Sequence, residues 1–303
     1  HPETTSYLYF PLANEAGMMA SITPRLHGDN KTGQHHFLLP PVSVEDLHNT
    51  KSGRNFWVYL AGVGPWSITG NTPYQLLHPQ EEAVSLQAGF LWHRITRINQ
   101  RLQLACEVTS FVPTNEDHVE LMKVKITNTG EENLEVIPTA AVPIYGRSAD
   151  CLRDHRHVTS LMQRIVTTEF GVVVSPTLSF DERGHRPNRM AYAVLGAEEQ
   201  GQPPQGFFPI LDEFIGEGGS LEWPEKVVTK ADDFYGAGQQ VTGGEAVGAL
   251  RFKPFQLKPG ESKSYIIIMA ISDEDTDFNA LARKYGQEAS FNRFLQANIC
   301  FWQ

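Results

Sequence analysis

The densest group of chemically capable side chains lies within residues 147–157. Three arginines, two aspartates and two histidines fall in this stretch: Arg147, Asp150, Arg153, Asp154, His155, Arg156 and His157. In one interpretation the stretch is a loop after a strand, in which Asp–Arg pairs hold an arginine or a histidine toward an anionic or polyhydroxylated ligand. In the other, the same charges form a buried ion network that only holds a long loop in place.

A second group of the same residue types follows another predicted strand. It places Asp181, Arg183 and His185 around Gly184. The two groups converge if the strands that precede them are neighbours in the fold. They then form either one ligand-facing rim or one structural brace.

Metal binding finds less support in the same residues. His155 and His157 would face the same way on a strand and so are spaced to share a metal ion. No third ligand follows at a useful spacing, and we therefore predict no metal site.

Catalysis by this chain is not supported either. Glycoside cleavage needs an acid together with a second carboxylate or an external nucleophile such as phosphate. The neighbouring acidic residues all fall in turn-like, solvated contexts: 81–82, 131–132, 232–233, and 273 with 275. An apolar setting that would raise a carboxyl pKa for acid work is missing around them, and no G-x-S-x-G motif is present. We assign no catalytic residue.

Three tryptophans offer flat apolar faces on which a sugar can stack. Trp57 follows basic and amide donors at 51–55, and Trp66 and Trp92 are further candidates. The alternative is that each indole belongs to the core, because aromatic side chains bury a large apolar area.

The composition narrows the class of protein. The chain has 303 residues, 41% of them hydrophobic, and a formal net charge of −10. This acidity disfavours nucleic acid as a partner, and no apolar run is long enough to span a membrane. Cys106, Cys151 and Cys300 are an odd, widely spaced set, which favours a reducing compartment and a cytoplasmic location.

The segments that position these residues are predicted to be mostly short β-strands. Apolar and polar residues alternate between turn signals in many segments, which predicts a large antiparallel β-supersandwich. The predicted strands are 55–60, 89–101, 102–111, 119–128, 134–142, 170–179, 190–195, 246–255 and 264–271. The short polar turn at 129–133 predicts that the strands on either side of it form a hairpin.

Two stretches depart from the strand pattern. Residues 197–244 are rich in glycine, proline and acids with scattered aromatics, which indicates a long excursion from the sandwich. Residues 273–303 carry apolar residues at helical spacing; Asp273 or Asp275 is the expected cap, and Gly286 divides the segment into two helices. We predict a sandwich domain at 1–272 and a helical linker at 273–303. The linker has no stop signal and the chain no initiator methionine, so we expect a piece of a longer polypeptide.

Several strings in the chain resemble 1,2-β-oligoglucan phosphorylases, which belong to the cellobiose and chitobiose phosphorylase family of inverting enzymes. The strings are YFPLANEAGMM at 9–19, FLLPPVSVEDLHN at 37–49, RNFW at 54–57, RSADCLRDHRHVTSL at 147–161 and TLSFDERGH at 177–185. The phosphorylase-like region of a cyclic β-1,2-glucan synthase is a close alternative.

This resemblance implies a modular enzyme with an N-terminal supersandwich, a helical linker, an (α/α)6 barrel and a small C-terminal β domain. An aspartate in the barrel would act as general acid, while inorganic phosphate attacks the glucan as co-substrate, without metal or other cofactor. The products would be α-glucose 1-phosphate and a shortened glucan. The barrel residues have no counterparts in this sequence, so none is carried over.

The leading hypothesis is therefore a non-catalytic module that braces the barrel and contributes to a homodimer interface or to the rim of an active site. A second hypothesis is a β-glucan-binding module that uses the three tryptophans. A third is a mutarotase-like sugar epimerase, in which His155 or His185 acts with Asp154 or Asp181.

Overall fold

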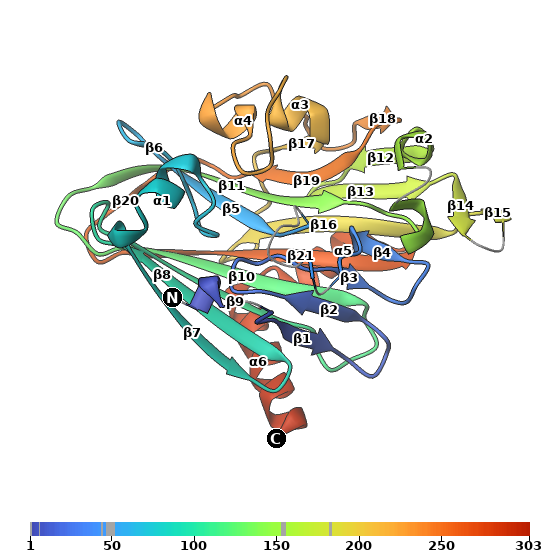
Figure 1. Ribbon diagram of the computed structural model, residues 1–303, viewed down its shortest axis with the longest axis horizontal. Helices are drawn as coiled ribbons and strands as arrows, with labels where there is room; N and C mark the ends of the chain where they lie inside the picture. The colour runs from blue at the N-terminus through green and yellow to red at the C-terminus, as the bar shows by residue number, and fades with distance from the viewer. Residues whose placement is uncertain (1, 6, 44, 47–51, 153–155, 182–183) are drawn as a thin grey trace.

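The computed structural model of the protein describes residues 2–5, 7–43, 45–46, 52–152, 156–181 and 184–303. Within them, the strands pair in antiparallel fashion into sheets of nine, six, four and two strands (Figure 1). The prediction of a mainly β, antiparallel sandwich is confirmed.

The two large sheets face each other. In order across the nine-stranded sheet the strands are β18 (Gln240–Thr242), β12 (Gln163–Thr167), β13 (Gly171–Pro176), β16 (Met190–Glu198), β21 (Ser262–Asp273), β10 (Val119–Asn128), β9 (Leu104–Phe111), β8 (Trp92–Asn99) and β7 (Glu82–Gly89). In order across the six-stranded sheet they are β17 (Gly206–Ile210), β19 (Ala246–Arg251), β11 (Leu134–Ile144), β5 (Asn55–Leu60) and β6 (Gly64–Ser67), with β20 (Phe255–Leu257) beside β11. Their facing side chains form the main core.

Smaller elements complete the fold. The four-stranded sheet contains β1 (Phe10–Ala13), β2 (Met19–Ile22), β3 (Asn30–Lys31) and β4 (Phe37–Leu39), and the two-stranded sheet contains β14 (Leu178–Asp181) and β15 (Gly184–Pro187). The helical elements are η1 (Pro2–Thr4), α1 (Pro73–Leu77), η2 (Pro79–Glu81), η3 (Ala149–Leu152), α2 (Arg156–Ser160), α3 (Leu211–Ile215), α4 (Glu225–Val228), α5 (Phe278–Tyr285) and α6 (Glu288–Trp302).

Strand β21 shows that the nine-stranded sheet is covered on both faces. Residues 265–271 of this strand read YIIIMAI, an apolar run without a break. Ile267 and Met269 lie in the core between the two large sheets, whereas Ile266 and Ile268 pack with α5 and α6 on the opposite face. An unbroken apolar run is expected where neither face of a strand meets water.

The turn at 129–133 does not make the predicted hairpin. Strand β10 belongs to the nine-stranded sheet and β11 to the six-stranded one, so the turn crosses between them. A second crossing, through the turn at 258–261, leads from β20 to β21. Asn128 connects the two crossings: its amide donates to the carbonyls of Glu132 (2.7 Å) and Leu257 (2.9 Å). Alternation within a strand predicts its buried face but not the sheet that it joins.

The excursion at 197–244 is an ordered cover rather than a loop. It contributes an edge strand to each large sheet, β17 and β18, and it lays α3 and α4 on the outer face of the six-stranded sheet (Figure 1). Phe214 and Val227 from the excursion pack with Trp57 and Phe208 of that sheet. Its aromatic side chains thus pack on the sheet that it covers.

Two C-terminal helices cover the outer face of the nine-stranded sheet. Phe278, Tyr285 and Phe291 pack against β10, β16 and β21 there. The predicted caps are wrong, because α5 begins after Asp277, whose carboxylate accepts the Ala280 N–H (3.1 Å). Gly286 separates the helices as predicted; a Cβ there would lie 2.6 Å from the Ala282 oxygen. The domain boundary at 272/273 stays a prediction.

A buried ion pair ties the four-stranded sheet to the two large ones. The Arg54 guanidinium donates to both carboxylate oxygens of Glu120, at 2.7 and 2.6 Å, and both side chains are fully buried. Asn30 of β3 donates to the same carboxylate (2.6 Å). Loss of either charged partner would leave an uncompensated buried charge, so this contact fixes the junction.

Candidate functional site

The two charged segments meet at one end of the sandwich. Helix η3 lies against the β14–β15 hairpin, and the Cys151 thiol donates to the Phe180 carbonyl (3.2 Å). Phe37, Tyr145 and Cys151 form a small apolar cluster there, with Phe180 packed against it. Figure 1 shows α2 and the hairpin at this same end. The two groups therefore converge, as the sequence allowed.

Arg147 is a brace in this arrangement. Its guanidinium donates to the Tyr145 carbonyl (2.8 Å), the Thr159 hydroxyl (2.9 Å) and the Glu245 carboxylate (2.5 Å). The side chain is buried, so these contacts join the end of β11 to α2 and to the segment that leads into β19. Asp150 is exposed and accepts from the Ser148 hydroxyl (3.1 Å). These contacts are those expected of an ion network, and the choice between a brace and a ligand-facing role stays a prediction for the segment as a whole.

Most of the other predicted loop residues lie outside the described residues: Arg153, Asp154, His155 and Arg183 entirely, and Arg156, His157 and Asp181 in their side chains. The backbone of residues 156–160 is helical, so the strand geometry assumed for His157 is wrong. Among the described residues no three His, Cys, Asp or Glu side chains gather as metal ligands.

His185 is described and exposed. Its ring packs on Phe180, with 4.3 Å between the ring centroids. The residue is thus held on the hairpin surface beside η3. Its proposed role with a carboxylate stays a prediction.

Two of the three tryptophans cannot serve as sugar platforms. Trp57 is 1% exposed beneath the excursion, and Trp66 is 2% exposed with its indole N–H donating to Glu82 (2.8 Å). The prediction that they stack with a sugar is wrong, because each face packs against protein. Trp92 is half-buried beside the α5–α6 cluster, and its role as a platform stays a prediction.

Glu82 also corrects the expectation that the acidic pairs are solvated. It is buried and accepts hydrogen bonds from Trp66, Gln75, Arg97 and Asn99, at 2.7–3.2 Å. A buried carboxylate surrounded by four donors is a structural anchor.

A cavity of about 560 Å³ opens beside the charged segments. Residues 40–43, Pro143, Leu152 and Ile215 supply its mostly apolar wall. Of the described residues that line it, Asp46 is the one with a titratable side chain. Such a wall suits packing against another structural element rather than chemistry.

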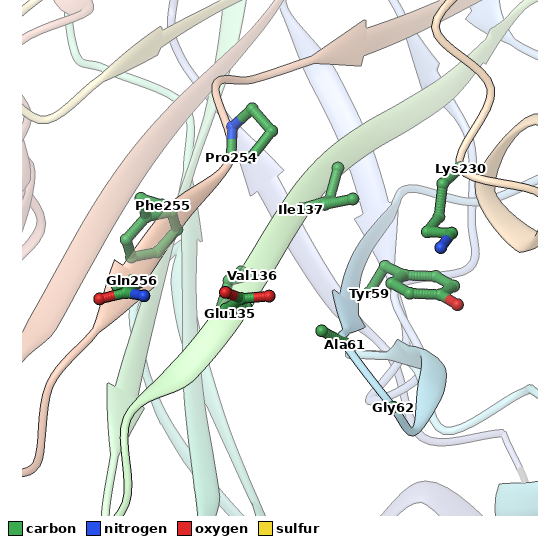
Figure 2. Close-up of a pocket in the computed structure, with 10 residues that line it drawn as sticks. All are labelled: Tyr59, Ala61, Gly62, Glu135, Val136, Ile137, Lys230, Pro254, Phe255 and Gln256. Atoms are coloured by element: carbon green, nitrogen blue, oxygen red, sulfur yellow. The ribbon is translucent and has the colours of Figure 1, made fainter.

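A second cavity, of about 450 Å³, lies on the outer face of the six-stranded sheet (Figure 2). Tyr59, Ile137 and Phe255 line it, with Glu135 and Lys230 among its polar residues. Sequence reasoning missed this site. The signal was present in the alternation of β5, which places Tyr59 on the same face as Trp57.

Comparison with known proteins identifies the fold. The model described as glycosyl hydrolase 94, supersandwich domain, matches residues 34–288, whereas no curated protein sequence matches the chain. A bacterial glucoamylase complexed with acarbose is similar with a TM-score of 0.55 and 7% identity, over 98% of this chain and 36% of that one. An α-mannosidase of family GH92 from Bacteroides thetaiotaomicron is similar with a TM-score of 0.43 and 12% identity, over 98% of this chain and 34% of that one.

A putative aldose 1-epimerase from Escherichia coli K12 gives a TM-score of 0.44 and 10% identity, over 88% of this chain and 99% of that one. The glucoamylase likeness shows the fold alone, and the chain spans about a third of the length of that protein. Separately, none of the described helices is long and apolar enough to cross a membrane.

Proposed function

The chain belongs to the supersandwich domain family of glycosyl hydrolase 94, and from this premise we propose that it serves an inverting β-1,2-glucan phosphorylase as its non-catalytic N-terminal module. In the complete enzyme, inorganic phosphate cleaves a β-1,2-oligoglucan to α-glucose 1-phosphate and a shortened glucan. The module packs against an (α/α)6 barrel and contributes to the rim of its active site or to a homodimer interface.

One observation carries this proposal. Two separate strings that resemble β-1,2-glucan phosphorylases, 37–49 and 147–161, both contribute to the wall of the 560 Å³ cavity. The two strings thus meet at one mostly apolar wall, and such a lining favours contact with a protein neighbour. The carboxylates described around it are braces or exposed groups, so the general acid belongs to the barrel.

The surroundings of the module fit a cytoplasmic enzyme. All three cysteines are free thiols, and Cys106 and Cys151 are buried. Burial raises the pKa of the Cys106 thiol well above its ordinary value, which keeps it protonated and unreactive. We propose the cytoplasm as its compartment, with neither nucleic acid nor a membrane as partner.

The test is an assay of the protein encoded by the complete reading frame that contains this chain. Incubation with β-1,2-gluco-oligosaccharides and inorganic phosphate is expected to release α-glucose 1-phosphate, and residues 1–303 alone are expected to release none. Cello-oligosaccharides and laminari-oligosaccharides serve as linkage controls. Release from one of these instead of the β-1,2-glucan would disprove the proposed linkage, and activity of residues 1–303 alone would disprove the non-catalytic assignment.

A further inference from the structure

The 450 Å³ cavity exists because the excursion covers only part of a sheet face. On β5 the side chains of Trp57 and Tyr59 point to the same outer face, as residues two apart on a strand do. Trp57 is 1% exposed beneath α3 and α4, whereas Tyr59 is half-buried and open to the cavity. The volume lies within the range of ~300–1,000 Å³ that is usual for small-molecule sites.

The cavity crosses three strands. On the outer face, Ile137 of β11 pairs with Tyr59 of β5, and Glu135 of β11 pairs with Gln256 of β20 (Figure 2). Glu135 and Gln256 lie on one side of the opening and Lys230 lies beside Tyr59 (Figure 2).

Phe255 pairs with Val136 and its ring faces the main core, with the Lys263 ammonium 4.4 Å from the ring centre. The apolar floor therefore consists of the Tyr59 ring and Ile137, and an acceptor, an amide and a donor surround it.

The polar groups at this cavity are not engaged elsewhere. Within the described part of the chain, the side chains of Glu135, Gln256 and Lys230 make no hydrogen bond or ion pair with protein. Nearby charged groups do pair, as Lys226 does with Asp233 (2.6 Å) and Lys263 with Glu198 (2.8 Å). The cavity thus combines the half-buried ring of Tyr59 with these three polar side chains.

Lys230 lies beside the cavity on a turn that Arg251 holds in place. Its backbone adopts φ +56°, the left-handed region that a lysine rarely occupies, and its ammonium lies 5.4 Å from the centre of the Tyr59 ring. Buried Arg251 donates to the carbonyls of Lys226 (3.0 Å) and Ala231 (2.9 Å), on either side of this turn. The left-handed residue closes the end of α4, where the Lys230 N–H donates to the Val227 carbonyl (3.2 Å) and the Ala231 N–H to the Lys226 carbonyl (3.1 Å). This turn and Arg251 together fix the backbone that carries Lys230 beside Tyr59.

From these observations we infer that the cavity is a carbohydrate-binding site for a short neutral oligosaccharide. A pyranose presents an apolar C–H face to an aromatic ring and hydroxyls at its edge, which is the combination that Tyr59 and the surrounding polar groups complement. An anionic ligand would meet the Glu135 carboxylate, and a cationic one would meet Lys230. The choice of a β-1,2-glucan as ligand rests on the proposed function, whereas the assignment to a neutral oligosaccharide rests on the cavity.

The experiment is calorimetric titration of the purified chain with β-1,2-glucotriose, cellotriose and laminaritriose at millimolar concentration. Saturable binding is expected for the β-1,2-linked sugar. Tyr59→Ala is expected to weaken it at least tenfold and Lys230→Ala about threefold, while Tyr59→Phe, which keeps the ring, stays within twofold. Tyr9→Ala, at a tyrosine that is 42% exposed on another surface, is the matched control and is expected to bind as the unmodified chain does.

Each outcome decides a separate point. Heat that saturates with cellotriose or laminaritriose and is lost in Tyr59→Ala supports the site while contradicting the β-1,2 linkage of the proposed function. Absence of binding for all three sugars, or equal binding by Tyr59→Ala and Tyr9→Ala, overturns the inference. Neither of those two results affects α-glucose 1-phosphate release by the complete enzyme, so the proposed function is tested independently. Melting temperatures of all variants show whether a loss of binding is a loss of fold.

Discussion

The outer faces of the two large sheets are covered in different ways. On the nine-stranded sheet, α5 and α6 present apolar residues at helical spacing and pack Phe278, Tyr285 and Phe291 directly onto the strands. On the six-stranded sheet, the cover is the excursion at 197–244, whose short helices and turns follow the sheet only in part. Both large cavities lie on the six-stranded side. A regular helix fills a sheet face evenly, whereas an irregular segment leaves space that a ligand or a neighbouring domain can use.

The two covers are also held in place by different kinds of polar contact. The helices are held by side-chain pairs at their edges, such as Lys123 with Glu288 (3.0 Å) and Tyr285 with Asp117 (2.5 Å). The excursion is held from beneath by Arg251, which donates to two of its backbone carbonyls. Disruption of the helical cover should therefore cost global stability, and disruption of the excursion should first affect the shape of its cavities.

The largest expected effect is on the packing of the helical cover. Phe291→Ala in α6 should lower the free energy of unfolding by about 3–5 kcal/mol, because a 0% exposed phenylalanine leaves a cavity between rigid elements. Phe214→Ala in α3, also at a 0% exposed position, is the matched variant. It should cost about 1–2 kcal/mol less, because the irregular cover can relax into the space. Denaturant unfolding measures both, and equal costs would contradict the comparison.

The next effect is on the attachment of the excursion. Arg251→Gln removes a buried guanidinium with contacts to Thr139, Lys226 and Ala231, and should cost about 2–3 kcal/mol. Limited proteolysis should show new cleavage within 197–244 before the rest of the chain is cut. Lys253→Gln, at an exposed lysine just beyond the same strand, is the control. Uniform cleavage along the chain would mean that Arg251 supports the whole sandwich instead.

A third effect concerns His93, a buried histidine on β8 that belongs to neither cover. Burial is the main cause that lowers the pKa of His93 to about 3, below its ordinary 6.5. The unfolded chain therefore takes up a proton as pH falls from 6.5 toward 3 while the folded chain does not, so stability is lost across this window. At pH 5 the loss should be about 2 kcal/mol relative to neutral pH. His93→Phe should remove this dependence in urea titrations, and an unchanged slope would refute the assignment.

The smallest effect concerns an edge contact of the helical cover. Burial acts to raise the pKa of Asp117, but hydrogen bonds from Lys284 and Tyr285 outweigh it and lower that pKa. The stabilisation is then present above the ordinary carboxyl pKa and is lost as pH falls through the lowered one. Asp117→Asn should cost about 1 kcal/mol at pH 7 and nothing measurable in strong acid. A cost independent of pH would indicate a packing role.

The sequence was sufficient for features that depend on local periodicity. Strands 55–60 and 119–128 coincide with β5 and β10, and the two C-terminal helices divide at Gly286 as predicted. These signals are local, because the period of apolar residues reports which face of an element is buried.

The rest depended on contacts between distant segments. Trp57 and Tyr59 share a face and a strand, yet only the excursion, some 150 residues later, decides that one is buried and the other open. Glu82 seemed solvated because its partners come from other strands, Trp66 from β6 in the six-stranded sheet and Asn99 from β8. The turn at 129–133 looked like a hairpin because a strand alone does not specify its partner.

The central place of β21 has a consequence for the biogenesis of the protein. This strand is the last of the chain, and it pairs with β10 on one side and β16 on the other. Until residues 262–273 leave the ribosome, both partners expose unpaired, apolar edges that invite pairing with other chains. Completion of the nine-stranded sheet therefore waits for the synthesis of residues 262–273, and a chaperone that shields strand edges during synthesis should raise the soluble yield.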